Sequence, residues 1–305
     1  MSKCYIIYHN DNDGECSAAI ATKYFTEHGK SKEDIVYIKG KHDGTMDIPD
    51  LSEHDYVTVL DYTLREVWIK YVIRITKIQN FLWIDHHVSH KDLYEKYTYI
   101  SGIRNCDIAA CELTYEYFYP GKEVPKFVKY IGDRDIWKWE YPDTAGFCEY
   151  MMFRDTKPKN EIWIDLFDEN VKLSSLIETG NELKKARMYN LKRIIKDTAY
   201  EDKIDGERCV KINSSDITST SDISQIMLDM VPYIHIAWVF YYKKVKGVEQ
   251  INNSLRSNKN IDVSVMAKNR GGGGHKHAAG WIYKHTEANK QKSEIRRFFN
   301  RMLGR

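Results

Sequence analysis

Short apolar runs alternate with helical spacing along the first half of the chain. Each run ends in polar residues, which is the pattern of a buried strand. Amphipathic spacing follows two of these runs and predicts helices that pack on a sheet. Strands alternating with helices predict βαβ units and a parallel sheet, whose functional residues gather at the carboxyl ends of the strands. The predicted strands are residues 3–8, 35–38, 56–60 and 81–84, and the predicted helices are residues 17–25 and 64–78.

The rest of the chain predicts two more helices, a connector and a second, smaller α/β domain. Residues 158–200 are charged and have only a sparse apolar face at helical spacing, which is typical of a connection between domains. The alternative is a packing helix at the surface of an oligomer, such as a homodimer. The fold class is therefore α/β, with domains at residues 1–157 and 204–305 and a helical linker at 158–203. The remaining predicted elements are helices at residues 109–119, 124–131 and 223–231, and strands at 209–212 and 234–242.

Composition and charge narrow the function classes. The chain of 305 residues has room for one large domain or two modest ones. It carries 46 basic and 44 acidic residues, a formal net charge of +2, which argues against a broad electrostatic grip on long nucleic acid. Aromatic residues make up 13% of the chain, so some rings are candidates for stacking surfaces.

Cysteine usage and hydropathy indicate the compartment. The six cysteines form no CxxC pair and no regular framework. A signal peptide and an apolar run of bilayer-spanning length are both missing. We therefore expect a soluble, cytoplasmic protein with reduced thiols and no membrane partner.

Acidic and imidazole side chains follow three of the predicted strands. Carboxylates and imidazoles together are ligands suited to Mn²⁺, Zn²⁺ or Fe²⁺. Singly, each has an ordinary explanation, because an aspartate after a strand often caps a helix and strand-end histidines are often exposed. Their shared position at carboxyl strand ends favours a common site. The candidates are His9, Asp11 and Asp13 after the first strand, Asp61 after the third, and Asp85, His86 and His87 after the fourth.

The segment DNDG at residues 11–14 also fits the start of an EF-hand calcium loop. That loop needs further oxygen ligands and a distal glutamate at set spacing, between two helices. Here a predicted strand precedes the segment and those ligands are missing. The sequence therefore excludes a calcium loop.

Two further acids, Asp133 and Asp135, flank an arginine after the predicted helix at 124–131. Such a group is usually a surface salt-bridge cluster. In this chain it could supply one more carboxylate to the metal site. The two side chains would point opposite ways in an extended segment, and a helix or turn would change that.

A run of four glycines near the end of the chain leads directly into His275. Such a run can be a flexible linker. Glycines beside a helix start would instead present backbone amides to a phosphate, with His275 adding charge or a hydrogen bond. The GxxxxGK[ST] spacing of a P-loop is missing, which excludes an NTPase. Arg256 is the candidate for bidentate phosphate recognition, although an arginine at a strand end can also be merely solvated. The glycine candidates are Gly272, Gly273 and Gly274.

Together, the four acidic segments resemble the motifs of the DHH phosphoesterase superfamily. Residues 270–280, RGGGGHKHAAG, match the GGGHxxAAG signature of the accessory DHHA1 domain. Residues 254–257, SLRS, resemble the serine–arginine segment of that domain and add Ser257 to the substrate-binding candidates. The motifs stand in the expected order and cover most of the chain. The resemblance implies a DHH catalytic domain and a DHHA1 substrate-binding domain, most like the oligoribonuclease (nanoRNase) branch.

The resemblance also implies a pair of divalent ions, usually Mn²⁺, with Mg²⁺, Co²⁺ or Fe²⁺ as alternatives. Two such cations can activate a water between them and neutralise the oxygens of a phosphoryl centre. One ion would be held by His9, Asp11 and Asp61, and the other by Asp13, Asp61, His86 and an acid of the fourth motif.

For the neighbouring residues the implied roles are less direct. His87 would face the phosphate as an electrostatic partner or as a proton donor to the leaving oxygen. Asp85 would accept a hydrogen bond from a ligand imidazole. In the fourth motif, Asp135 fits the Asp-x-Trp arrangement of the oligoribonuclease branch, and Asp133 is the rival ligand.

The expected function is a Mn²⁺-dependent phosphodiesterase that hydrolyses short RNA or dinucleotides to nucleoside monophosphates. A compact, nearly neutral chain without an evident further nucleic-acid module favours short substrates. Hydrolysis of a cyclic mono- or dinucleotide, or of 3′-phosphoadenosine phosphate, is the alternative within the same chemistry. A non-catalytic nucleotide-binding protein is the alternative from another class.

Overall fold

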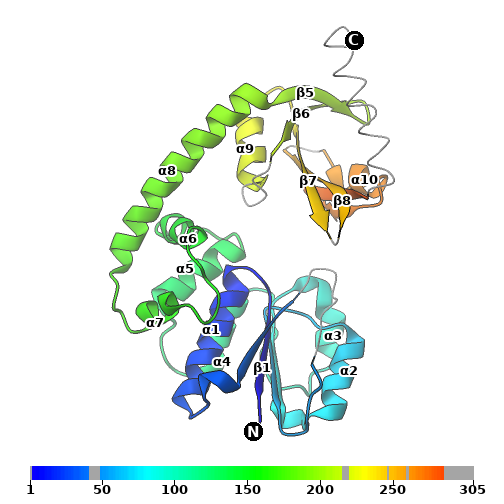
Figure 1. The fold of residues 1–305 in the computed structure, drawn as a ribbon. Coiled ribbons are helices and arrows are strands. Elements are labelled where there is room, and N and C mark those ends of the chain that lie inside the picture. Colours follow the sequence, from blue (N-terminus) through cyan, green and yellow to red (C-terminus); the bar gives the residue numbers. More distant parts are fainter. Residues whose placement is uncertain (1, 41–48, 215–219, 246, 259–260, 285–305) are drawn as a thin grey trace. The chain divides into compact units, whose positions relative to one another are not determined.

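The computed structural model describes residues 2–40, 49–214, 220–245, 247–258 and 261–284. The chain divides into two compact units, Met1–Lys185 and Ala186–Arg305. Both contain helices and a sheet, which confirms the α/β fold class (Figure 1). Within the described residues, no helix has the length and apolar character needed to span a membrane. None of the six cysteines is in a disulfide.

The first unit is built on a four-stranded parallel sheet with the order β2-β1-β3-β4. All four strands lie where the apolar runs predicted them. Because the three pairings are parallel, the carboxyl ends of the strands share one edge of the sheet. The strands are β1 (Cys4–Tyr8), β2 (Ile35–Lys39), β3 (Tyr56–Leu60) and β4 (Phe81–Ile84).

Helices cover both faces of this sheet, as the continuous apolar runs require. Along β1, Ile6 belongs to one buried cluster and Ile7 to another, because successive side chains point to opposite faces. The two helix layers flank β1 in Figure 1. The layer on the Ile6 side contains α1 (Asn12–Glu27), α4 (Ala110–Phe118), α5 (Lys126–Asp135), α6 (Thr144–Met152) and α7 (Glu161–Phe167); the layer on the Ile7 side contains α2 (Glu66–Ile75) and α3 (Lys91–Lys96).

Several helix boundaries differ from the predicted ones, and two of these differences matter for the site. Helix α1 begins at Asn12 rather than at residue 17, so Asp13 lies in its first turn. Asp11 is the N-cap, and its side chain accepts a hydrogen bond from the amide of Gly14. Helix α5 continues to Asp135, so both acids of the fourth motif are helical. Capping and helix propagation moved these ends beyond the apolar pattern from which they were predicted.

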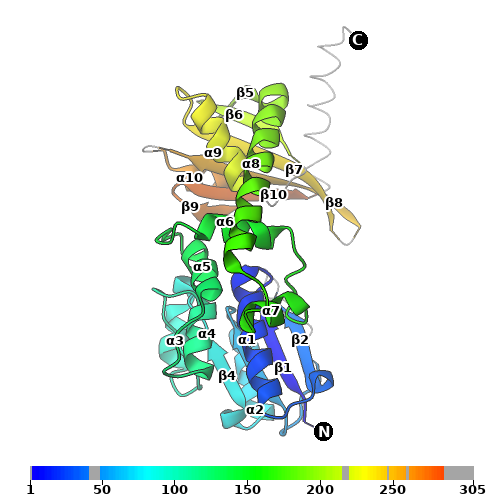
Figure 2. The same ribbon diagram turned by 90° about the vertical axis from the view of Figure 1, so that its left-hand side faces the viewer.

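The second unit is built on a six-stranded sheet with the order β5-β6-β7-β8-β10-β9. Only β6 and β7 pair in parallel; the other neighbours are antiparallel. Two helices, α9 (Thr220–Met230) and α10 (Val263–Lys268), pack on this sheet (Figure 2). The strands are β5 (Tyr200–Ile204), β6 (Glu207–Asn213), β7 (Ile236–Val245), β8 (Val248–Ser257), β9 (Gly273–His275) and β10 (Ala278–Lys284).

The expected helix start after the glycine run is wrong. The glycines lead into β9, which pairs antiparallel with β10, and helix α10 precedes them. A Cβ at Gly274 would lie 2.5 Å from the carbonyl oxygen of Ala278, and the φ of Gly274 is +139°. The glycines therefore permit close approach of two strands rather than opening a helix.

Residues 158–203, expected as a connector, contain α7 and the long helix α8 (Leu173–Thr198). The beginning of α8 contacts α6, where a Cβ at Gly180 would lie 1.8 Å from the carbonyl oxygen of Gly146. Its later residues Leu191 and Ile195 belong to the buried cluster of the second unit. Helix α8 thus contributes to the packing of both units.

Candidate functional site

Three strand ends bring the predicted metal ligands together in the first unit. His9 follows β1, Asp61 follows β3 and Asp85 follows β4, and these strands are neighbours in the sheet. Helix α5 adds Asp135 from its last turn. Residues far apart in sequence therefore meet at one edge, as the βαβ pattern predicted.

The meeting residues form two groups, each with an ionisable ligand atom per residue within 4.8 Å of the others. Asp61 belongs to the first group, and its Oδ1 lies 3.1 Å from Nε2 of His86, which belongs to the second. Both groups combine carboxylates with imidazole, a donor set that suits Mn²⁺, Zn²⁺ or Fe²⁺. The groups are His9, Asp61 and His87, and Asp13, His86 and Asp135.

Asp61, a member of the first group, lies next to the second group and has an unusual backbone conformation. Its φ is 51°, a left-handed conformation that non-glycine residues adopt rarely and often at functional positions. Its amide donates to the carbonyl of Ile84, which ties the turn to the neighbouring strand. Its carboxylate is 1% exposed, and its oxygens face one histidine of each group, at 3.5 Å from Nδ1 of His9 and 3.1 Å from Nε2 of His86. Burying a carboxylate is costly, and a divalent cation at this place would offset that cost.

The electrostatics of the groups also fit cations. Burial, followed by repulsion from neighbouring carboxylates, raises the pKa values of Asp13 and Asp135, and burial raises that of Asp61 well above its usual range. Hydrogen bonds to Asp11 and Asp61 raise the pKa of His9 to about 10. Carboxylates crowded in this way are stabilised as anions by positive charge placed between them.

Local structure around the first motif fixes the position of His9. Nδ1 of His9 lies 2.6 Å from Oδ2 of Asp11, whose other oxygen caps α1. A Cβ at Gly14 would lie 2.2 Å from the carbonyl oxygen of His9, so only glycine allows the helix to start this close to the strand end. Asp11 is thus beside His9, although it is in neither group.

The carboxylate of Asp13 is held by the start of another helix. Its two oxygens accept hydrogen bonds from the amides of Ala110 and Cys111, at 3.0 and 2.8 Å. A helix N-terminus favours negative charge. Oδ2 of Asp13 also lies 3.6 Å from Nε2 of His86, so α4 orients this side chain toward the second group.

Asp85 forms hydrogen bonds with the two histidines that follow it, His86 and His87. It is fully buried and accepts hydrogen bonds from the amide of His86 and from the hydroxyl of Thr63. Nδ1 of His87 lies 2.7 Å from Oδ1 of Asp85, and this interaction raises the pKa of His87 to about 9. Asp85 is therefore placed to orient His87, leaving the other ring nitrogen available to the site.

The two acids of the fourth motif have different surroundings. Asp135 lies in the second group, with Oδ2 3.4 Å from Nε2 of His86. Asp133 is buried and accepts hydrogen bonds from the amides of Glu140 and Tyr141 and from the hydroxyl of Thr144. Residues two apart on a helix face different sides. The helix thus directs Asp135 to the groups and Asp133 to the following loop.

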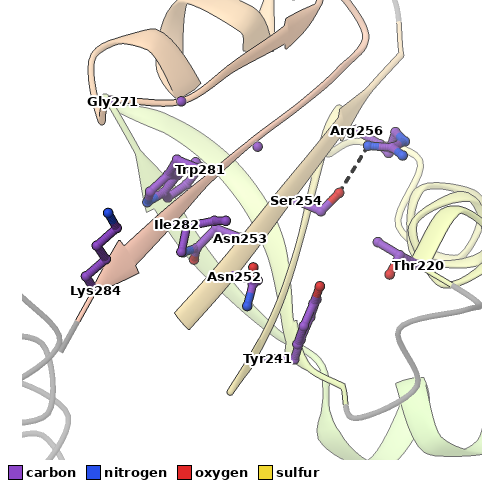
Figure 3. Close-up of a pocket in the computed structure, with 12 residues that line it drawn as sticks. Thr220, Tyr241, Asn252, Asn253, Ser254, Arg256, Gly271, Trp281, Ile282 and Lys284 are labelled. Atoms are coloured by element: carbon purple, nitrogen blue, oxygen red, sulfur yellow. Dashed lines mark hydrogen bonds between the residues drawn. The ribbon is translucent and has the colours of Figure 1, made fainter. Parts of the chain in front are cut away.

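The second unit contains a cavity of about 600 Å³ on the sheet face that carries Arg256 (Figure 3). Nη1 of Arg256 donates to the hydroxyl of Ser254, and its guanidinium is half-buried. Burial lowers the pKa of Arg256, and no described carboxylate forms an ion pair with it. A half-buried guanidinium without an acidic partner is suited to an anionic ligand.

Only some predicted substrate-binding residues line this cavity. Arg256 and Gly272 do, while Gly273, Gly274, His275 and Ser257 are not among the lining residues. The hydroxyl of Ser257 donates instead to the carbonyl of Ile261.

Sequence reasoning missed Asn252 and Tyr241, which line the same cavity. The alternation along β8, with buried residues at 251, 253 and 255, places residues 252, 254 and 256 on the opposite face. The sequence carries this alternation only at Ile251 and Leu255, because Asn253 is polar, so it gave little signal for Asn252. Tyr241 gave no such signal, because it lies within the almost continuously apolar first part of β7.

Comparison with known proteins identifies the second unit. Residues 209–304 match the family model of the DHHA1 domain. This segment is similar to DHHA1 domains. The cavity containing Arg256 therefore lies in the segment that matches the DHHA1 model, as the signature at residues 270–280 predicted.

Further comparisons cover nearly the whole chain. An uncharacterized protein of Acanthamoeba polyphaga mimivirus is 28% identical over 288 residues, covering 91% of this chain and 67% of that protein. A DHH-domain structure from a member of the s1p family of ribosomal proteins covers 99% of this chain and 87% of that one, with a TM-score of 0.57 and 14% identity. A pGpG-specific phosphodiesterase from Vibrio cholerae covers 96% and 97%, with a TM-score of 0.52 and 13% identity.

These likenesses show that the chain shares the fold of the DHH-domain structure, with the DHHA1 match at the expected place. The recognition of a DHH/DHHA1 architecture is confirmed. The assignment to the oligoribonuclease branch stays a prediction.

Proposed function

We propose that the protein is a metal-dependent phosphodiesterase that hydrolyses short linear oligoribonucleotides or dinucleotides to nucleoside monophosphates. The observation that carries the proposal is the position of Asp61, a buried carboxylate of the first group whose oxygens face His9 of that group and His86 of the second. A carboxylate in that position is suited to bridge two cations. The crowded carboxylates of the second group, Asp13 and Asp135, support the same conclusion.

One cation would be held by His9, Asp11 and Asp61, and the other by Asp13, Asp61, His86 and Asp135. Mn²⁺ is the proposed metal, and Mg²⁺, Co²⁺ and Fe²⁺ are alternatives with related ligand preferences. When bound, the ions supply an activated water and neutralise charge at the phosphoryl centre.

His87 is proposed to contact a phosphate oxygen and to protonate the leaving oxygen. Its pKa is raised to about 9 by Asp85, so the ring carries a proton at neutral pH. The hydrogen bond from Nδ1 to Asp85 orients the ring and leaves Nε2–H as the donor. The chain's own contribution here is thus a fixed, charged donor.

Short substrates are favoured by the charge and by the DHHA1 cavity. A net charge of +2 provides little general attraction for long nucleic acid. Arg256 in the DHHA1 cavity is proposed to bind a terminal or internal phosphate. The Vibrio cholerae protein of similar fold is named for hydrolysis of pGpG, which supports a linear dinucleotide as the first substrate to test.

The test is a substrate panel at equal concentration with a metal titration. The panel contains pGpG, pApA, tri- to pentaribonucleotides, a cyclic mononucleotide, a cyclic dinucleotide and 3′-phosphoadenosine phosphate. We expect monophosphate release fastest from the linear substrates, with Mn²⁺, and none from Asp61→Asn. Preference for a cyclic substrate or for 3′-phosphoadenosine phosphate would replace the proposed substrate. Nucleotide binding without turnover at any metal concentration, unchanged in Asp61→Asn, would indicate a non-catalytic nucleotide-binding protein.

A further inference from the structure

Two exposed tryptophans follow Asp135, a member of the second candidate metal group, in the sequence. The side chains of Trp137 and Trp139 are 68% and 43% exposed. Their ring centroids are 5.6 Å apart, and their planes meet at 75° in an edge-to-face contact. Each ring thus restricts the orientation of the other while leaving apolar surface in contact with solvent. Large rings exposed together commonly mark a binding surface.

The backbone under this pair is strained and well anchored. Trp137 and Trp139 both have a φ of 57°, a left-handed conformation that is rare for bulky residues. The amide of Lys138 donates to the carbonyl of Asp133, and the amide of Glu140 donates to its carboxylate. The loop is therefore held in a conformation that exposes two indoles rather than burying them. Strain of this kind gathers where a ligand is bound.

The loop leaves the metal site directly. Trp137 is two residues after Asp135, a member of the second group, and two residues span at most about 7 Å. A phosphate held at the two groups would therefore place the attached nucleoside within reach of the pair. The occupant that fits is a flat, aromatic ring carried on a phosphate, because bases stack on indole faces regardless of their identity.

We propose that Trp137, with its orientation fixed by Trp139, stacks on the nucleobase next to the phosphate that is cleaved. This inference rests on the proposed phosphodiesterase function and adds its specificity: the enzyme selects nucleotides over other phosphodiesters. Stacking does not read the base edge, so purine and pyrimidine dinucleotides are both substrates. The pair supplies binding and positioning, and it takes no part in proton transfer.

The experiment compares Trp137→Ala and Trp137→Phe with the wild type on two substrates. One substrate is the ribonucleotide pApA, and the other is the same molecule without its bases. With pApA, we expect the KM of Trp137→Ala to rise about 5- to 150-fold, the range for loss of one base–aromatic contact, and Trp137→Phe to stay near the wild type. With the abasic substrate, all three proteins should have the same KM. The matched control is Tyr99→Ala, which removes a ring that is 61% exposed in the same unit.

The outcomes separate this inference from the proposed function. If the wild type hydrolyses neither substrate, the proposed function fails. If the wild type hydrolyses pApA and Trp137→Ala has an unchanged KM, stacking is refuted while the function stands. An equal loss on both substrates would mean that Trp137 only supports Asp135, and a change of oligomeric state in Trp137→Ala would make the pair an interface between copies. Either result overturns the inference.

Discussion

Separate replacements of Asp133 and Asp135 should have different effects: the first should lower stability and the second should weaken metal binding. Asp133 is 3% exposed and accepts three hydrogen bonds, from the amides of Glu140 and Tyr141 and from the hydroxyl of Thr144. Asp135 instead faces the second group of proposed ligands. The Asp133→Ala protein should therefore be less stable and still bind metal. The Asp135→Asn protein should fold normally and bind metal weakly.

The magnitude follows from the three donors that lose their acceptor. Leaving a donor unsatisfied costs about 1 kcal/mol where water can reach it and about 3 kcal/mol where it cannot. The amides of Glu140 and Tyr141 lie in an exposed loop, whereas Thr144 is fully buried. The expected loss in the free energy of unfolding for Asp133→Ala is thus about 3–5 kcal/mol. Asp133→Asn keeps one oxygen as an acceptor and should lose less.

The change in the free energy of unfolding is expected to have the opposite sign for Asp135→Asn in the metal-free protein. Burial and repulsion from Asp13 raise the pKa of Asp135, so its charged form is disfavoured in the folded state. A neutral amide removes that repulsion, and the free energy of unfolding without metal should stay equal or increase.

Urea unfolding with EDTA measures the stability of each variant, and titration calorimetry with Mn²⁺ measures its metal affinity. Asp133→Asn is the variant to titrate if Asp133→Ala does not fold. Loss of Mn²⁺ binding in Asp133→Asn, together with wild-type binding in Asp135→Asn, would refute the reasoning and make Asp133 the ligand.

Three further predictions concern the metal, the cavity and a glycine. Mn²⁺ at 100 times its dissociation constant should raise the free energy of unfolding of the wild type by about 2.7 kcal/mol, and by much less in Asp61→Asn, as thermal unfolding with and without EDTA would reveal. Arg256→Ala should raise KM about 10- to 150-fold with kcat little changed, because the substrate phosphate loses a charged hydrogen-bonding partner. The control is Arg208→Ala, which removes an exposed ion pair with Glu201. Equal effects of the two replacements would contradict the assignment. Gly14→Ala should lower both the thermal midpoint and the Mn²⁺ affinity, since its Cβ would lie 2.2 Å from a carbonyl oxygen; wild-type affinity in a folded variant would contradict this.

Several features of the first unit could be predicted from the sequence because their physical cause is local. The strand β3 coincides with the predicted residues 56–60, and β4 with 81–84. A continuous apolar run is buried on both faces wherever it lies, so its place in a parallel sheet is implied by composition alone. The placement of Asp61 after β3 followed from the same argument.

Other features could not be predicted, because they depend on partners distant in sequence. The choice between Asp133 and Asp135 depended on how far α5 continues and on Thr144, whose hydroxyl donates a hydrogen bond to Asp133. The glycine run at residues 271–274 was compatible with a helix start, and only pairing with β10 made Gly273 and Gly274 part of a strand. The local sequence pattern of a segment carries no information on which strand will pair with it.

The sequence by itself determined the α/β class, the strands of the first sheet and the set of acids and histidines that end them. Period and composition suffice for these, since burial of an apolar run and the chemistry of a side chain do not depend on distant contacts. Only the tertiary structure decided which of those side chains meet. It placed Asp61 in a strained conformation between two groups, turned Asp133 away, and left Trp137 and Trp139 exposed beside Asp135. These outcomes depend on contacts across the chain, because the direction of a side chain is set by the backbone and neighbours that surround it.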